Sequence, residues 1–74
     1  MVFEKIKEMI EEMSGENTKI SPEMRLMADI GFDSLDIVDL IFDLENEFEI
    51  EIEDEELEKI RTVADLVNII EKKI

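Results

Sequence analysis

The sequence predicts an all-α fold, a small four-helix bundle with three main helices and one short helix. Apolar residues recur at helical spacing in three separate segments, and residue types that cap helices precede the later segments. The chain has 74 residues, a length that corresponds to one domain. We therefore expect a single domain over residues 1–74, with a long loop between the first two main helices.

The first expected helix opens the chain and ends near Ser14 and Gly15. Its apolar residues have the spacing of one buried helix face, namely Val2, Phe3, Ile6, Met9, Ile10 and Met13. Residues 16–33 follow as the long loop, in which Ser21 and Pro22 favour a single helical turn. We expect four apolar side chains to hold this loop on the core: Ile20, Leu26, Met27 and Ile30.

The second main helix is expected from about Ser34 to Phe48, with Asp33 as its N-cap and Asp36 completing a capping box. Residues 49–53 alternate like a strand, but a lone strand would have no partner. We expect an extended connector whose Ile50 and Ile52 point inward.

The last third of the sequence predicts two further helices. Asp54 is expected to cap a short helix that buries Leu57 and Ile60. Thr62 is expected to cap the final helix, with Asp65 at the capping-box position. The apolar stripe of that helix consists of Val63, Leu66, Val67, Ile70 and Ile74.

The helix after Ser34 has two apolar arcs when its residues are placed about 100° apart. One arc is wide enough to face the core and contains Ile37, Leu40, Ile41, Leu44 and Phe48. The other contains Leu35, Val38 and Phe42, and acidic residues surround it. Either both arcs are buried, or the second is an exposed stripe that docks a protein with a basic rim.

The charge balance restricts the partners. The chain has 22 acidic and 8 basic residues, a net charge of -14, and no basic residue from position 26 to 58. Nucleic acids and anionic membranes require positive patches, so we expect neither nucleic-acid binding nor membrane insertion. No apolar run approaches the roughly 20 residues of a membrane span. We expect a cytoplasmic, monomeric domain with basic protein partners.

Ser34 is the residue whose role the sequence leaves most open. A nucleophilic serine requires an adjacent base, yet the chain has no His and lacks the G-x-S-x-G motif. The nearby carboxylates do not match a calcium-binding loop, and there is no Cys. We therefore expect no catalytic residue and no dedicated metal site. Ser34 is then an ordinary surface serine or an attachment point, because a helix N-terminus favours a phosphate.

The segment DIGFDSLDIVDL, residues 29–40, resembles the prosthetic-group site of acyl carrier proteins. The later runs LENEFEIEI and DEELEKIRTV resemble the same family, and the resemblance covers essentially the whole chain. It implies a 4'-phosphopantetheine arm from coenzyme A on Ser34, with Asp33 and Leu35 beside the attachment point. Acyl groups would be carried on this arm as thioesters and presented to the enzymes of fatty acid synthesis.

The resemblance also implies partners and a docking surface. The partners would be a holo-acyl-carrier-protein synthase, or another phosphopantetheinyl transferase, and acyl-transfer and chain-elongation enzymes with basic patches. The docking residues would be Asp33, Leu35, Asp36, Val38, Asp39, Phe42, Glu45 and Glu47. A growing acyl chain would be lined by Leu26, Leu44, Ile52, Ile60 and Leu66, unless these five residues are plain core.

Two alternatives stay open at this stage. Ala28, Phe42, Asn46 and Glu53 depart from the pattern common in the family, which is compatible with a specialised carrier of polyketide or aminoacyl and peptidyl intermediates. The second alternative is of a different class, an unmodified acidic helical module that docks a basic protein. Modification of Ser34 separates this module from either carrier.

Overall fold

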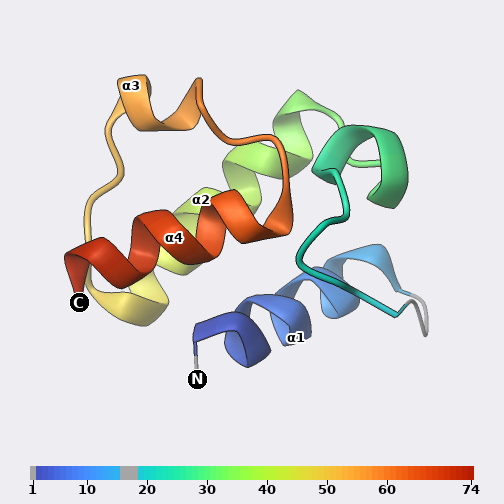
Figure 1. The fold of residues 1–74 in the computed structure, drawn as a ribbon, viewed down its shortest axis with the longest axis horizontal. Helices are drawn as coiled ribbons and strands as arrows, with labels where there is room; N and C mark the ends of the chain where they lie inside the picture. Colours follow the sequence, from blue (N-terminus) through green and yellow to red (C-terminus); the bar gives the residue numbers. More distant parts are fainter. Residues whose placement is uncertain (1, 16–18) are drawn as a thin grey trace.

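The chain folds as a small helical bundle, described here over residues 2–15 and 19–74 of a computed structural model. Three main helices and one short helix are present, and a single π-helical turn lies in the long loop (Figure 1). In chain order they are α1 (Val2–Ser14), η1 (Leu26–Ile30), α2 (Ser34–Phe48), α3 (Asp54–Leu57) and α4 (Val63–Lys73). No strand occurs within those two ranges, and the all-α prediction is confirmed.

The core lies where α1 packs against α4 and α2. Every fully buried residue in the described ranges is apolar, so the core carries no desolvated charge. Its most deeply buried side chains are Ile6, Ile10, Leu26, Leu40, Leu44, Val63, Leu66 and Ile70. They come from all three main helices and from η1, so no single helix can bury its apolar face without the others.

Two of the three expected caps form as the sequence predicts. Asp33 caps α2 in a reciprocal box with Asp36, and Thr62 caps α4 with Asp65. The third prediction was wrong by one residue, because Glu53 is the N-cap of α3 and Asp54 is its first helical residue. The backbone N–H of Glu53 donates to the Glu56 carboxylate at 3.0 Å, so the acid three residues later completes the start of α3.

The end of α3 also differs from the prediction. The helix stops at Leu57, before the buried Ile60 that the sequence had suggested as part of its apolar face. Ile60 instead enters the core from the segment that joins α3 to α4. The short helix is therefore held largely by the residues that flank it, as a four-residue helix has too few hydrogen bonds to be stable alone.

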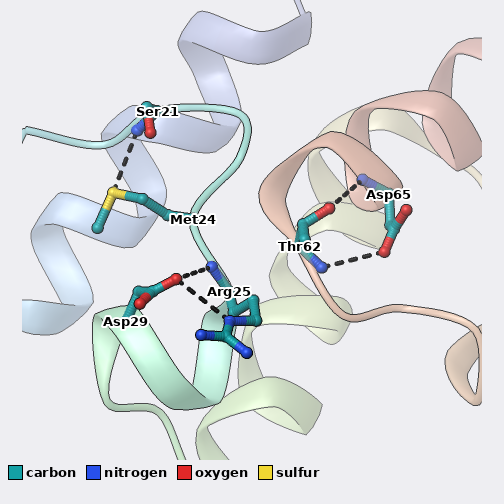
Figure 2. Close-up of polar contacts among 6 residues, drawn as sticks. All are labelled: Ser21, Met24, Arg25, Asp29, Thr62 and Asp65. Carbon is teal, nitrogen blue, oxygen red and sulfur yellow. Dashed lines mark hydrogen bonds and ion pairs between the residues drawn. The ribbon is translucent and has the colours of Figure 1, made fainter.

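The loop between α1 and α2 forms its helical turn later than expected. Pro22 and Glu23 lie in a tight turn closed by the Met24 N–H on the Ser21 carbonyl, and the helical turn begins only at Leu26. An isolated antiparallel bridge pairs Arg25 with Thr62, so the segment before η1 lies beside the segment before α4. Figure 2 shows this region, where the Ser21 N–H also contacts the Met24 sulfur at 3.3 Å.

The loop is anchored by fewer side chains than the sequence suggested. Leu26 and Ile20 are buried and Ile30 packs against the core, as expected. Met27, however, is 55% exposed, so its predicted place in the core was wrong. It follows Leu26 directly in the helical turn, and adjacent helical residues point in different directions.

The connector from α2 to α3 is extended and pairs with no strand, as the alternation of acidic and apolar residues in 49–53 predicted. Glu49 ends α2 in the left-handed region with φ of 54°, after which Ile50 is half-buried and Ile52 is buried. The Ile52 N–H donates to the Glu45 carboxylate at 2.7 Å. The backbone of the connector is therefore hydrogen-bonded to a side chain of α2 and not to a neighbouring strand.

Candidate functional site

The backbone before α2 holds Ser34 at a defined exposed position. Gly31 ends η1 with φ of 93°, a left-handed conformation that favours glycine. The N–H groups of Gly31 and Phe32 both donate to the Leu26 carbonyl, and the Phe32 side chain is buried. This turn fixes the direction in which the chain enters α2 and leaves Ser34 exposed as its first residue.

The N-terminus of α2 presents free amide donors around Ser34. The Asp33 carboxylate accepts from the Asp36 N–H at 2.9 Å, and the Asp36 carboxylate accepts from the Asp33 N–H at 3.2 Å. The first amides of a helix lack carbonyl partners within it, which leaves those of Ser34 and Leu35 directed out of the helix end. Together with the positive end of the helix dipole, these donors suit an anionic group bonded to the Ser34 hydroxyl.

The second apolar arc of α2 is on the surface. Leu35 is 75% exposed, Val38 43% and Phe42 59%, whereas the first arc contributes Leu40, Ile41 and Leu44 to the core. The interpretation in which both arcs are buried is therefore wrong, because no element within residues 2–15 and 19–74 covers the second arc. Leu35, Val38 and Phe42 form what we call the α2 stripe, which begins directly beside Ser34.

The acidic residues proposed for docking divide by the contacts they make within the chain. Asp39 is exposed on α2 near the α2 stripe, while Asp33 and Asp36 hold the helix cap. Glu47 lies 3.5 Å from the Lys5 amine of α1. Glu45 is half-buried and binds the connector through Ile52. Four of the five acids thus already make a contact within the chain, and the contact of Glu47 is an exposed ion pair that contributes little to stability.

A small pocket of about 110 Å³ opens beside η1. It is lined by Arg25, Leu26, Met27, Ala28, Ile37, Ile60 and Arg61, and we call it the arginine pocket. Only Leu26 and Ile60 of the five residues suggested for an acyl lining border it. The other three, Leu44, Ile52 and Leu66, are buried in the core.

Sequence reasoning missed Arg25 and Arg61 as site residues. They are the only two arginines of the chain, and Arg25 borders its longest segment without basic residues, 26–58, while Arg61 lies shortly after that segment. That charge pattern was the available signal. It could not show that the two residues meet, because the hydrogen bond from the Leu26 N–H to the Arg61 carbonyl exists only in the folded chain.

Each arginine is followed, four residues later, by an aspartate that caps its backbone. The N–H of Arg25 donates to Asp29 at 2.8 Å and that of Arg61 donates to Asp65 at 2.9 Å (Figure 2 shows the first pair). The bond from the Arg25 N–H is the main cause that lowers the pKa of Asp29. Burial works to raise the pKa of Asp65, but hydrogen bonds from Arg61 and Thr62 outweigh it and lower that pKa. Both carboxylates are therefore held in their charged form.

Among the described residues, no group of three or more acidic side chains is arranged to hold a metal ion. None of the helices in that part of the chain has the length and apolar character needed to cross a membrane.

Comparisons with known proteins agree with one another on the family. A sequence model described as a phosphopantetheine attachment site matches residues 4–70. The chain is 46% identical to an acyl carrier protein of Thermotoga maritima, covering 99% of this chain and 91% of that protein. It is 52% identical to one of Clostridium acetobutylicum, covering 95% and 92%. A crystal structure of an acyl carrier protein from Thermotoga maritima superposes with a TM-score of 0.83 at 38% identity, covering 99% and 91%.

Proposed function

Because the chain belongs to the acyl carrier protein family, we propose that it carries acyl groups as thioesters on a 4'-phosphopantetheine arm bonded to Ser34. The observation that supports this assignment is the position of Ser34. It is the first, exposed residue of a helix whose cap is supplied by a different side chain, Asp33. The Ser34 hydroxyl is thus left available for modification.

The residues around Ser34 fit a phosphodiester. The exposed turn after Gly31 leaves room for a modifying enzyme, and the free amides of Ser34 and Leu35 favour a negatively charged group. Once attached, the arm would supply a terminal thiol, the group that this chain lacks because it has no Cys. Asp33 and Leu35 lie on either side of the attachment point and orient it by the cap and by the start of the α2 stripe.

Ser34 has no activating base of its own, so a transferase must perform the attachment. In that step the Ser34 hydroxyl gives its proton to the transferase, and its Oγ bonds to the phosphorus of coenzyme A that carries the pantetheine. The bond from this phosphorus to the bridging oxygen of the diphosphate breaks. Adenosine 3',5'-bisphosphate leaves with that electron pair. We accordingly assign no catalytic role to any residue of this chain, which acts as a carrier.

The α2 stripe and its acids support docking to enzymes with basic patches. Leu35, Val38 and Phe42 provide exposed apolar contact area, and Asp39 adds charge that attracts a positive surface. The partners we propose are a phosphopantetheinyl transferase and then the acyl-transfer and elongation enzymes of fatty acid synthesis, in the cytoplasm. Glu45 is a weaker docking candidate, because its carboxylate is engaged with Ile52.

The test is the intact mass of the chain after incubation with coenzyme A and a phosphopantetheinyl transferase of broad specificity. We expect one adduct of phosphopantetheine mass, which Ser34→Ala abolishes. The chain has three serines, and Ser21→Ala, in the loop before η1, is the matched control that should leave the adduct intact. An unmodified chain would favour the unmodified interaction module, and an adduct that survives Ser34→Ala would contradict attachment at Ser34.

A further inference from the structure

We propose that Met27, on η1, is part of the surface that the phosphopantetheinyl transferase contacts when it modifies Ser34. The inference rests on the proposed function, because it requires a transferase that acts on Ser34. It deepens that function by adding a contact residue from a second element. The transferase would then meet apolar side chains on both sides of Ser34, the α2 stripe on one side and Met27 on the other.

Met27 is one of five large apolar side chains that are exposed in residues 2–15 and 19–74. Three of the others form the α2 stripe, and the fifth, Ile74, follows α4. A single exposed apolar residue is common on protein surfaces and indicates nothing by itself. What distinguishes Met27 from Ile74 is its position relative to Ser34.

Backbone hydrogen bonding places Met27 close to Ser34. The Phe32 N–H donates to the Leu26 carbonyl at 2.9 Å, and that carbonyl belongs to the peptide group that joins Leu26 to Met27. Ser34 follows Phe32 by two residues, and two residues span at most roughly 7 Å. The Cα atoms of Met27 and Ser34 are therefore no more than about 15 Å apart.

A transferase that reaches the Ser34 hydroxyl covers a wider area than this one residue. Specific protein interfaces bury about 800 Å² on each partner, and a round patch of that area has a radius of about 16 Å. A patch centred on Ser34 therefore extends as far as Met27, whose side chain is 55% exposed.

Met27 and the α2 stripe lie on opposite sides of Ser34. At about 100° per residue, Val38 and Leu35 are displaced from Ser34 in one direction around α2, by roughly 40° and 100°. Ile37 is displaced by roughly 60° in the other direction. Met27 borders the arginine pocket together with Ile37, so it lies on that second side.

The charge near Met27 favours an apolar contact over an electrostatic one. Asp29 is the one acidic residue of η1, and Arg25 binds it through a backbone N–H bond of 2.8 Å and an ion pair of 3.5 Å. The Arg25 side chain is 63% exposed, so a basic partner gains little attraction on this side of Ser34. Methionine suits such a contact, because its flexible side chain adapts to the surface that it faces.

The experiment measures transfer of phosphopantetheine from coenzyme A to the chain, with the transferase of broad specificity and intact mass as the readout. Initial rates are taken over a range of chain concentrations. We expect Met27→Ala to raise the KM for the chain about threefold or more and to leave kcat within about twofold of the wild-type value. A contact remote from the reacting atoms is present both in the bound complex and in the transition state, so its loss changes KM and not kcat.

Two further variants separate docking from a general effect of substitution. Met27→Leu keeps an apolar side chain of similar size and should have the wild-type KM. Ile74→Ala truncates a side chain that is 64% exposed at the C-terminus, which lies across the molecule from η1 (Figure 1), and it should also have the wild-type KM. All three variants should keep the wild-type thermal midpoint, because the substituted residues are exposed.

Salt provides a second readout of the kind of contact. In about 0.5 M salt, exposed charges are screened over a few ångströms, so the KM of Asp39→Asn should approach that of the wild type. The ratio of KM values between Met27→Ala and the wild type should stay the same, because an apolar contact does not depend on charge.

Four results would overturn the inference. They are an unchanged KM in Met27→Ala, an equal rise of KM in Ile74→Ala, an equal rise in Met27→Leu, and a Met27→Ala effect that disappears in salt. Each of these results requires a wild-type chain that is modified at Ser34. A wild-type chain that gains no phosphopantetheine mass would instead contradict the proposed function, so the two failures are distinguishable.

Discussion

Glu45 illustrates how one residue can look like part of a docking surface and serve the fold. Its carboxylate accepts the Ile52 N–H at 2.7 Å and is half-buried between α2 and the connector. Hydrogen bonds to charged groups contribute about 1.5–3 kcal/mol. We expect Glu45→Ala to lower the free energy of unfolding by roughly 1–2 kcal/mol, measured by chemical denaturation.

Glu45→Gln is the matched variant, because it removes the same negative charge but keeps an oxygen that can accept from Ile52. We expect it to lose less than half as much stability as Glu45→Ala. Equal losses in both variants would mean that the charge of Glu45, rather than its hydrogen bond to the connector, stabilises the fold.

At the scale of the element, α2 has one apolar face in the core and the α2 stripe on the surface. Phe42 is 59% exposed, so Phe42→Ala should change the free energy of unfolding by less than about 0.5 kcal/mol. The same substitution should reduce the rate of phosphopantetheinyl transfer several-fold, because the one aromatic contact of the stripe is lost. The two measurements are denaturation and initial transfer rates followed by mass spectrometry.

Leu44→Ala is the contrasting variant on the same helix. Leu44 is fully buried, so its truncation should cost about 2–5 kcal/mol of stability. Its transfer rate should stay near the wild-type value under conditions where the variant is folded. Normal transfer by Phe42→Ala would show that the α2 stripe is not the surface the transferase contacts.

At the scale of the whole molecule, the net charge of -14 opposes the compact state. Lowering the pH from 7 neutralises acids and should first raise the thermal midpoint at low salt. Asp29, Asp65 and Glu56 act in the opposite sense, because hydrogen bonds lower their pKa values in the folded chain. Their contribution is complete above the unfolded pKa of about 4 and is lost as the pH falls through the lower folded values.

The expected curve of midpoint against pH therefore rises from pH 7, reaches a maximum at mildly acidic pH and falls below about pH 4. Calorimetry at low ionic strength measures it. In about 1 M salt, where charges are screened within roughly 3 Å, the rise should flatten while the acid fall persists. A midpoint that decreases steadily from pH 7 would show that charge repulsion does not limit this fold.

Relations between residues close in the sequence were sufficient to predict the local structure around Ser34. A helix cap joins residues three apart, and an apolar arc joins residues three and four apart. The bounds of α2, the cap at Asp33, the place of Ser34 as the first helical residue and the two arcs of α2 could therefore all be predicted. The same local reasoning found the cap of α4 at Thr62, and it missed the cap of α3 by one residue.

What the sequence by itself determined is the order of the helices and the position of Ser34 at the exposed start of α2. Only the tertiary structure decided that the α2 stripe stays uncovered, that Glu45 binds the connector, and that Arg25 and Arg61 line one pocket. Each of these depends on contacts between segments distant in the chain. Such contacts form when apolar faces from several helices are buried together. The periodicity of one segment shows which of its faces is buried, but it does not show which other segment will pack against that face.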